Sequence, residues 1–593
     1  MRRTLRRWMV GLGVLILLVS AAGCQRASEK SERASADWSR GIKLGQAAIN
    51  SPVGMTVGAA GEVYLAWVGE DRAQGGEFLQ WVHLDGAGRV VARNRLPIEI
   101  VNATQVELAP AAEGTLHLTW LDRRTKGAFL YHARLDASGT VLAPPRAISL
   151  AEAAAHSYAL AQRGDGSLDI FWGAKEGAAP GLYHLLLSPT GEVQEENRPL
   201  ERLGFDPNCR FDATGTLHLV WHEETGLERF HIYYATFDPV RRVLVNPTPL
   251  VSYALGIGLV EHRPSLGLAG QEVYIFWSRE RRGGGLSQPT AEAYYLTFPA
   301  GQPERAGSPR QVNIPANNHP AYIPVSEVPP LTQWATVPAA SLPAQFIYMA
   351  CAGPSAGPNL FTAFAVELVG RTKSIVQVVT TVWREGELQG YQVSGKTRSS
   401  SLRPNLLADP QGHLHLAWLD TAGFGAYDVF YASTSPAVRA ELNRITGRDV
   451  ANAFFDFLWG VAQAASFLPI VFAWVFVPLI LVALYLFIRV EGDLARRGPR
   501  WMLVVSILLY IATKYLFRSN WMAALPLPPN LAPALADAFL YATPLAISAV
   551  AGLLTWFFIK RREYTSLFMA FLVYVACDAA LTLLIYVPGI LAE

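Results

Sequence analysis

The sequence predicts a multidomain chain, with an all-β propeller followed by an α-helical transmembrane bundle of four helices. Two observations lead to this prediction. A strand motif ending in tryptophan recurs about every 50 residues between 61 and 418, and four long apolar stretches follow residue 460. Repeats with periods of ~20–50 residues are typical of propellers and solenoids, and apolar stretches of ~20 residues are typical of membrane-spanning helices.

Composition supports a membrane-attached protein with a large soluble middle. The 593 residues correspond to three or four domains of ~150 residues, unless one large all-β unit absorbs several. Charge is balanced, with 50 Lys+Arg against 48 Asp+Glu, and 51% of residues are hydrophobic. These values exclude a disordered chain and a nucleic-acid binder held by overall basicity. Mean hydropathy is +0.20, and the apolar excess lies at the two ends of the chain.

The first 23 residues have the pattern of an export signal peptide. Four arginines precede a short apolar run, 9–19, which is too short to span a membrane of ~30 Å. The segment Ala21-Ala22-Gly23-Cys24 resembles a bacterial lipoprotein lipobox, which implies lipidation of Cys24. Ordinary cleavage and an uncleaved anchor remain alternatives. Residues 24–37 are polar without apolar periodicity and are expected to form a tether.

The middle of the chain contains the repeat. Its members are GEVYLAW (61–67), GTLHLTW (114–120), GSLDIFW (166–172), GTLHLVW (215–221), QEVYIFW (271–277) and GHLHLAW (412–418). The first five tryptophans follow one another at intervals of 53, 52, 49 and 56 residues. Most units contain about four short strands joined by turn residues, without room for a crossover helix. Four antiparallel strands per unit predict a propeller blade, and a solenoid of β coils is the alternative.

The expected propeller covers 38–434. Residues 344–394 supply four further strands between the fifth and sixth motifs, which gives seven blades, with six as the alternative. The final unit, 402–434, has only three strands, while 39–47 reads as a strand without a blade of its own. We therefore expect the N-terminal strand to complete the last blade and close the ring.

After residue 434 the pattern becomes helical. Residues 435–460 are predicted to form an amphipathic linker helix, and 461–593 a membrane domain. The expected spans are 463–488, 501–517, 533–559 and 566–590. The short loops 489–500 and 560–565 are basic, so both are predicted to be cytoplasmic. This topology predicts a multi-pass protein of the bacterial cytoplasmic membrane with its propeller on the extracytoplasmic side.

Two ionisable residues lie within the expected spans. Lys514 and Asp578 are both about 13 residues from the cytoplasmic start of their helices, at matching depth. An intramembrane charge usually pairs or faces a cavity. We interpret the two residues as a helix–helix salt bridge, with an ion or proton path as the alternative.

The G-x-L-H-L-x-W strands resemble those of the sialidase-like (BNR-type) bacterial propellers. This resemblance covers about two-thirds of the chain and implies the propeller fold. The Asp-box Ser-x-Asp-x-Gly-x-x-Trp of that group is missing from every blade, so the resemblance implies the fold rather than the hydrolase activity.

Polar residues that flank the tryptophan strands form the candidate binding site. In a blade, the loop after the second strand and the loop before the first strand emerge on one face. The polar residues of these two kinds of loop are therefore expected to converge around the central funnel. The first set is Glu70, Asp122, Glu223, Arg279 and Asp420, and the second is Arg263, Arg403, Asn208 and Asn405. Such a ring of carboxylates, guanidinium groups and amides could bind a glycan, a peptide or an ion. Solvated loop charges and blade-to-blade salt bridges are the alternative interpretation.

No metal site or cofactor is predicted. His117, His218 and His415 share one repeat position, which indicates packing rather than metal ligation. Cys209 and Cys351 fall in different blades and are expected to be buried thiols, and Cys577 is expected to pack within a membrane helix. Four scattered cysteines do not make a disulfide framework.

The sequence therefore predicts a membrane-anchored, extracytoplasmic propeller that acts as a ligand- or protein-binding and assembly module. A sialidase-like glycan hydrolase and a subunit of a membrane complex are the alternatives. The expected partners are the lipid bilayer, a protein or glycan ligand at the funnel, and a membrane protein, but no nucleic acid.

Overall fold

The fold was analysed in a computed structural model. It describes residues 30–71, 75–123, 128–225, 229–254, 256, 259–281, 290–317, 320–337, 345–370, 374–423, 425–464, 468–517, 525, 533–562 and 564–592. The chain forms two compact units. One is a propeller, Glu29–Val369 and Ser374–Arg444, and the other holds the helices from Ile445 onward.

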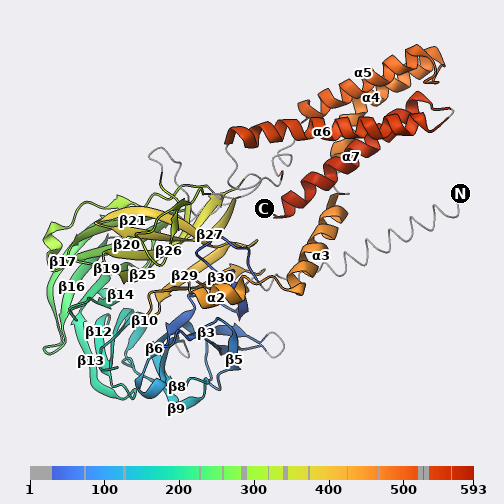
Figure 1. The fold of residues 1–593 in the computed structure, drawn as a ribbon. Coiled ribbons are helices and arrows are strands. Elements are labelled where there is room, and N and C mark those ends of the chain that lie inside the picture. The colour runs from blue at the N-terminus through green and yellow to red at the C-terminus, as the bar shows by residue number, and fades with distance from the viewer. Residues whose placement is uncertain are drawn as a thin grey trace. The chain divides into compact units, whose positions relative to one another are not determined.

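The propeller has seven blades, as the repeat count predicts, and their colours follow one another around the ring in Figure 1. The first three blades are β2(Gly54–Val57) β3(Val63–Glu70) β4(Glu77–Leu84) β5(Val90–Arg95), β6(Thr104–Pro110) β7(Leu116–Asp122) β8(Phe129–Leu135) β9(Val141–Ala147), and β10(Ala153–Gln162) β11(Leu168–Gly177) β12(Gly181–Leu187) β13(Val193–Glu201). The fourth and fifth are β14(Gly204–Phe211) β15(Leu217–Glu224) β16(Arg229–Asp238) β17(Val243–Ala254), and β18(Leu259–Glu261) β19(Ser265–Ala269) β20(Glu272–Arg281) β21(Thr290–Pro299) β22(Arg310–Gln311).

The hairpin β23(Ile323–Pro324) β24(Gln333–Trp334) lies between the fifth and sixth blades in sequence. The sixth blade is β25(Gln345–Ala356) β26(Asn359–Val369) β27(Ser374–Arg384) β28(Glu387–Gly395), and the seventh is β29(Ser401–Ala408) β30(Leu414–Thr421) β31(Tyr427–Ser433) with β1(Ile42–Ala47). First strands of successive blades contact one another all the way round, from β2 and β6 to β29 and β2. These strands therefore surround the propeller axis.

The N-terminal strand closes the ring. β1 pairs with β31 in antiparallel register, from Ile42 opposite Tyr431 to Ala47 opposite Tyr427. Lys43 Nζ lies 2.7 Å from a carboxylate oxygen of Asp428 across this pair. The last blade is thus built from both ends of the propeller sequence.

The repeated tryptophans pack by one rule. In five blades the indole stacks on the aromatic ring directly opposite it on the next strand, with ring centroids 4.4–5.9 Å apart, in the pairs Trp120–Tyr131, Trp172–Tyr183, Trp221–Tyr233, Trp277–Tyr294 and Trp418–Phe430. Cross-strand aromatic pairs contribute about 0.5–1.5 kcal/mol beyond the area that they bury. The motif's terminal tryptophan is therefore a structural element of these five blades.

The predicted linker helix is interrupted. It divides into α2(Pro436–Leu442), which belongs to the propeller unit and buries Val438 and Leu442 in its core, and α3(Gly447–Ala464). The break has a local cause, because the side chains of Thr446 and Asp449 hydrogen-bond each other's backbone N–H groups and begin a new helix.

The remaining helices are α4(Leu468–Arg489), α5(Arg497–Leu516), α6(Pro533–Lys560) and α7(Leu567–Ala592). Three of the described helices are long and apolar enough to cross a membrane, over Pro469–Arg489, Asp537–Lys560 and Leu567–Tyr586. α5 forms as a helix where a fourth span was predicted, but it is not among these three. Its crossing of the membrane stays a prediction.

Candidate functional site

The first strands carry a recurring bulge at the propeller axis. In the second, fourth and seventh blades two residues stand unpaired opposite the tryptophan, and the first of them is Gln105, Asp206 or Arg403. These three residues have φ of 49°, 53° and 50°, a left-handed conformation that is uncommon outside glycine. Strain of this kind concentrates at functional sites, and a bulge re-aims the side chain that it carries.

Two more blades depart from regular pairing at nearby positions. In the fifth blade, His262 N bonds to Ser278 O and Ser265 pairs with Phe276, which leaves Arg263 and Pro264 opposite the tryptophan. In the third blade the register shifts around His156. Five blades thus place a polar or charged side chain at the inner-strand irregularity.

The axis is crossed by a charge pair from distant blades. Arg263 Nη1 of the fifth blade lies 4.0 Å from Glu107 Oε1 of the second blade. Gln105 Nε2 donates to Glu107 Oε1 at 3.2 Å and to Tyr158 O of the third blade at 2.7 Å. Burial raises the pKa of Glu107, although Arg263 and Gln105 oppose that shift. The axis is therefore a polar, partly buried site.

A second carboxylate at the axis has the opposite shift. Asp206 lies 3.6 Å from His222 Nδ1 and 3.8 Å from His156 Nε2. Burial alone would raise the pKa of Asp206, but the hydrogen bond and charge of His222, together with His156, lower it far below its ordinary value. His222 Nε2 and Arg263 Nε are buried and have no hydrogen-bond partner among the described residues.

A third group lies between the fourth and fifth blades. The Arg279 guanidinium stands over the rings of Tyr253 and Tyr294, at 4.4 and 5.4 Å from their centroids, and its Nε is 3.6 Å from Glu261 Oε2. The side chain of Glu261 is only 2% exposed, and burial raises its pKa to about 7. Within the described residues, the two Glu261 oxygens and the Tyr253 hydroxyl are buried without a hydrogen-bond partner.

Three carboxylates of the predicted ring accept hydrogen bonds from the repeated tryptophans. The indole Nε1 of each tryptophan donates to the acidic side chain two residues later, at 3.4 Å in Trp120–Asp122, 3.0 Å in Trp221–Glu223 and 2.9 Å in Trp418–Asp420. Asp122 also accepts from Val101 N, and Asp420 from Ser401 Oγ. Burial raises the pKa of Asp420 to about 7. These contacts give the three carboxylates a role in packing.

The other predicted residues take three kinds of position. Arg403 Nε donates to Asn50 Oδ1 at 3.2 Å, and Asn405 Nδ2 to Val53 O at 2.9 Å, so both link the seventh blade to the segment before β2. Asn208 is partly buried in β14, two residues beyond Asp206. Glu70 is exposed at the end of β3.

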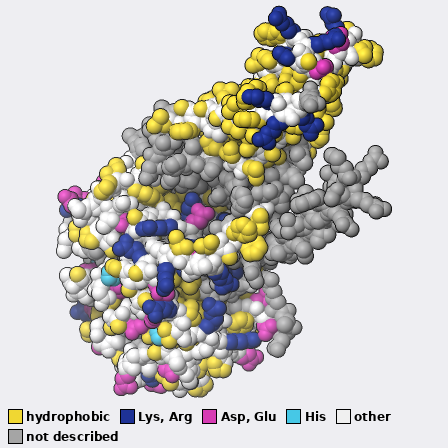
Figure 2. Space-filling model, turned by 45° about the vertical axis from the view of Figure 1, so that its right-hand side comes forward, with side chains coloured by type: hydrophobic (Ala, Val, Ile, Leu, Met, Phe, Trp, Pro, Cys, Tyr) yellow, Lys and Arg dark blue, Asp and Glu magenta, His cyan; other side chains and the backbone are white. Residues whose placement is uncertain are grey.

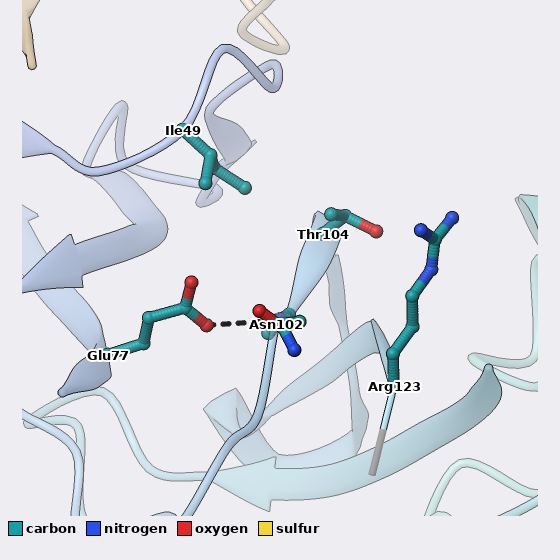
Figure 3. Close-up of a pocket in the computed structure, with 6 residues that line it drawn as sticks. Ile49, Glu77, Asn102, Thr104 and Arg123 are labelled. Atoms are coloured by element: carbon teal, nitrogen blue, oxygen red, sulfur yellow. Dashed lines mark hydrogen bonds between the residues drawn. The ribbon is translucent and has the colours of Figure 1, made fainter. Parts of the chain in front are cut away.

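A pocket of about 270 Å³ borders the bulge of the second blade. In Figure 3 Glu77 and Arg123 lie on opposite sides of it, with Thr104 and Ile49 between them. Glu77 Oε2 accepts from Ala103 N at 3.1 Å, which fixes the carboxylate at the wall. Thr104 directly precedes Gln105, the first residue of that bulge.

The repeat histidines hydrogen-bond within their blades. His117 Nδ1 lies 3.0 Å from His132 Nε2, His218 Nδ1 2.6 Å from the Tyr234 hydroxyl and His415 Nδ1 2.7 Å from the Tyr431 hydroxyl. Burial lowers the pKa of His117 to about 4. In the described part of the chain no group of three or more His, Cys, Asp or Glu residues could hold a metal ion.

The cysteines divide by position. Cys24 lies outside the described residues, as does the side chain of Cys351. Cys209 is a free, buried thiol whose pKa burial raises, and Cys577 is a free thiol in α7.

Lys514 and Asp578 meet in the helical unit. Lys514 Nζ donates to Asp578 Oδ2 at 2.7 Å and to Thr582 Oγ1 at 2.8 Å. Asp578 also accepts from the Tyr510 hydroxyl at 2.8 Å and from Ser548 Oγ at 2.6 Å. The network joins α5, α6 and α7 with every charged atom hydrogen-bonded, which is the arrangement of a helix–helix salt bridge.

The sequence prediction missed Gln105, Glu107, His156, Tyr253 and Glu261. A signal existed for the bulges, because Asp206, Arg263 and Arg403 are each followed by proline, which cannot donate to a strand ladder. No local signal marks Glu107 or Glu261, because the arginines that face them, Arg263 and Arg279, come from another blade or strand.

No family of known proteins matches the sequence, and no curated protein is similar to it. Among solved structures the chain is similar to the polysaccharide lyase Uly1, at 10% identity and a TM-score of 0.38 over 65% of this chain and 90% of that one. It is similar to a PL25 ulvanlyase at 9% identity and a TM-score of 0.41, over 65% of this chain and 95% of that one. It is also similar to the α-L-arabinofuranosidase Arb93A of Fusarium graminearum at 12% identity and a TM-score of 0.34, over 56% of this chain and 92% of that one. Likeness at this level does not extend to function.

Proposed function

We propose that the chain is a membrane-anchored, extracytoplasmic binding module whose propeller axis takes a glycan carrying carboxylate or sulfate groups. The observation that carries this proposal is the inner-strand irregularity repeated in five blades, with Gln105, His156, Asp206, Arg263 and Arg403 around one axis. Regular pairing would present these side chains to the neighbouring blades.

Charge at the axis favours an anionic ligand. Arg263 and Arg403 are joined there by Arg210, whose Nη1 donates to Gly353 O of the sixth blade at 3.0 Å. Against these cations stand the carboxylates of Glu107 and Asp206. Because Arg263 Nε has no hydrogen-bond partner among the described residues, it is a donor that a ligand can satisfy.

The binding test uses the full chain in mild detergent. A hexamer of galacturonate should bind more tightly than cellohexaose, measured by thermophoresis, and Arg263→Gln or Arg403→Gln should weaken binding at least tenfold, since a charge-assisted hydrogen bond contributes about 1.5–3 kcal/mol. Arg93→Gln, an exposed position on β5, is the matched control. Equal affinity for both sugars, or tight binding of an acidic peptide in their place, would contradict the proposal.

Location has its own support and its own test. The two basic loops lie at one end of the helical unit, because Leu494 N bonds to Thr565 O at 3.2 Å and Leu567 N to Gly492 O at 2.7 Å. Positively charged short loops favour the cytoplasmic side. Protease added to intact spheroplasts should therefore remove the propeller and leave the helices, and a protected propeller would contradict this topology.

A glycan hydrolase is the second candidate, and Glu261 is the observation that favours it. A carboxylic acid with a pKa near 7 beside an arginine and a tyrosine hydroxyl suits general acid catalysis. Release of shorter products from the galacturonate hexamer, lost in Glu261→Gln, would support this candidate over binding alone.

A further inference from the structure

The basic end of the helical unit carries a surface that anchoring alone does not require. Seven cations lie on its two loops, at Arg489, Arg496, Arg497, Arg500, Lys560, Arg561 and Arg562. Figure 2 shows Lys and Arg side chains gathered at this end, next to hydrophobic sides. The described acidic residues of the loops are Glu491 and Asp493.

Most of these cations have no carboxylate partner. Arg496 pairs with Glu491, and Arg500 donates to the carbonyls of Leu494 and Ala495 within its own loop. In the described part of the chain no carboxylate pairs with the other five, Arg489, Arg497, Lys560, Arg561 and Arg562, and all five are exposed. With seven cations against Glu491, Asp493 and Glu563, the two loops carry net positive charge.

The two loops are held together as one platform. Asp493 forms an isolated bridge with Ser566, flanked by the hydrogen bonds from Leu494 N to Thr565 O and from Leu567 N to Gly492 O. Because backbone bonds on both sides fix the loops to each other, their cations are pre-positioned for one ligand surface.

Apolar side chains lie directly beside these cations. Phe487, Ile488, Val490 and Trp501 are 85%, 66%, 86% and 71% exposed. At the second basic loop, Trp556 and Tyr564 are 52% and 64% exposed, and Lys560 Nζ stands 5.0 Å from the centroid of the Trp556 ring. Tryptophan, tyrosine and basic residues at one level are typical of the membrane–water interface.

We infer that this platform binds the phosphate-bearing headgroups of anionic phospholipids. A lipid matches both halves of the surface, because its phosphate meets the arginines while its acyl chains cover the exposed apolar residues. A free phosphate would leave the apolar half uncovered. The inference rests on the membrane anchoring proposed above.

The test is native mass spectrometry of the full chain in mild detergent with added phosphatidylglycerol, phosphatidylcholine or inorganic phosphate. Phosphatidylglycerol should bind at least tenfold more tightly than phosphatidylcholine. The variant Arg489→Gln/Arg497→Gln/Arg561→Gln/Arg562→Gln should lose that preference, since each cation near an anionic surface contributes about 1 kcal/mol. A matched control, Arg93→Gln/Arg241→Gln, removes two exposed arginines of the propeller and should keep the preference for phosphatidylglycerol.

Equal binding of the two lipids, or an unchanged preference in the fourfold variant, would overturn the inference. Binding of inorganic phosphate as tight as that of phosphatidylglycerol would also overturn it, in favour of a soluble anion. Thermal unfolding of the fourfold variant at the wild-type temperature shows that lost binding does not reflect lost folding. Carbonate extraction separates the two proposals: a chain removed from membranes refutes anchoring, whereas a retained chain without lipid preference refutes only this inference.

Discussion

The helical unit and the propeller axis both bury charge, but they complete its hydrogen bonding differently. In the helical unit, Asp578 accepts from Lys514, Tyr510 and Ser548, and Lys514 also reaches Thr582. At the propeller axis, buried nitrogen atoms of Arg263 and His222 have no hydrogen-bond partner among the described residues.

This difference separates structural charge from charge available to a ligand. A buried network is stabilising when all its members are satisfied, and an unsatisfied member costs about 1–3 kcal/mol. A fold bears that cost where binding compensates it, so the unpartnered nitrogen atoms of Arg263 and His222 point to the propeller axis rather than to the Lys514–Asp578 network.

The largest effect is expected where the network is complete. Asp578→Ala leaves the Lys514 ammonium buried and unpaired, and should lower the free energy of unfolding of the helical unit by about 3–5 kcal/mol. Unfolding of the full chain by SDS, followed by circular dichroism, measures the change.

The matched variant Lys514→Met/Asp578→Leu removes both charges and should recover most of that loss, because apolar residues of similar volume replace a buried pair at little cost. If Asp578→Ala were as stable as wild type, the complete hydrogen bonding of the helical unit would not distinguish it from the propeller axis.

The tryptophan-bound carboxylates should behave like the helical network rather than like the axis. Asp420→Ala leaves Trp418 Nε1 and Ser401 Oγ without their acceptor, at a cost of about 1–3 kcal/mol, read as a lower unfolding temperature by tryptophan fluorescence. Glu70→Ala at an exposed position should change stability by less than about 0.5 kcal/mol. If Asp420→Ala lost glycan binding without losing stability, Asp420 would be a ligand-binding residue and not a packing residue.

The buried carboxyl group of Glu261 should make the stability of the propeller depend on pH. Burial raises its pKa to about 7 from an ordinary value of 4.5, so between these values the folded chain holds a neutral acid while the unfolded chain is ionised. Its contribution to stability is therefore complete below pH 4.5 and is lost as pH rises to 7. Glu261→Gln should show a smaller fall in unfolding temperature between pH 5 and pH 8 than wild type. An identical fall in both proteins would contradict the raised pKa.

The smallest effect is expected at an exposed pair between the second and third blades. Arg146 Nη1 lies 3.1 Å from Glu192 Oε2, with these side chains 39% and 75% exposed. Glu192→Gln should change the unfolding free energy by about 0.2–1 kcal/mol and leave glycan binding unchanged. A larger loss of stability would show that solvent-exposed charge also holds the blades together.

Repetition made the fold predictable. Six tryptophan-ended strands predicted the blades, and the three-stranded remainder at 402–434 pointed to a strand from elsewhere, which is where β1 pairs. Apolar length predicted the C-terminal helices, although α5, with Lys514 near its end, falls short of the other three.

The contacts of the candidate site were harder to predict, for reasons of geometry. Side chains two residues apart in a strand share a face, so Asp122 and Asp420 lie beside their own tryptophans, and this alternation was available in the sequence. The contact between Glu107 and Arg263 was not, because it joins the second blade to the fifth across the axis. Arg263 and Arg403 were predicted in the loops that enter the first strands, and their role in binding stays a prediction. The bulges that re-aim them depend on the pairing of whole strands.

The pairing of β1 with β31 also has a mechanical consequence. Both strands belong to one blade and run antiparallel, so the chain enters the ring and leaves it at the same end of a single ladder, beside Ser39 and Ser433. Tension applied between the two ends of the propeller sequence would act first on the contacts of residues 31–40, such as Glu32 N with Lys396 O and Thr332 N with Asp37, and then on that ladder one hydrogen bond after another. The seam of the ring would therefore separate like a zipper, because its hydrogen bonds are loaded in sequence and not all at once.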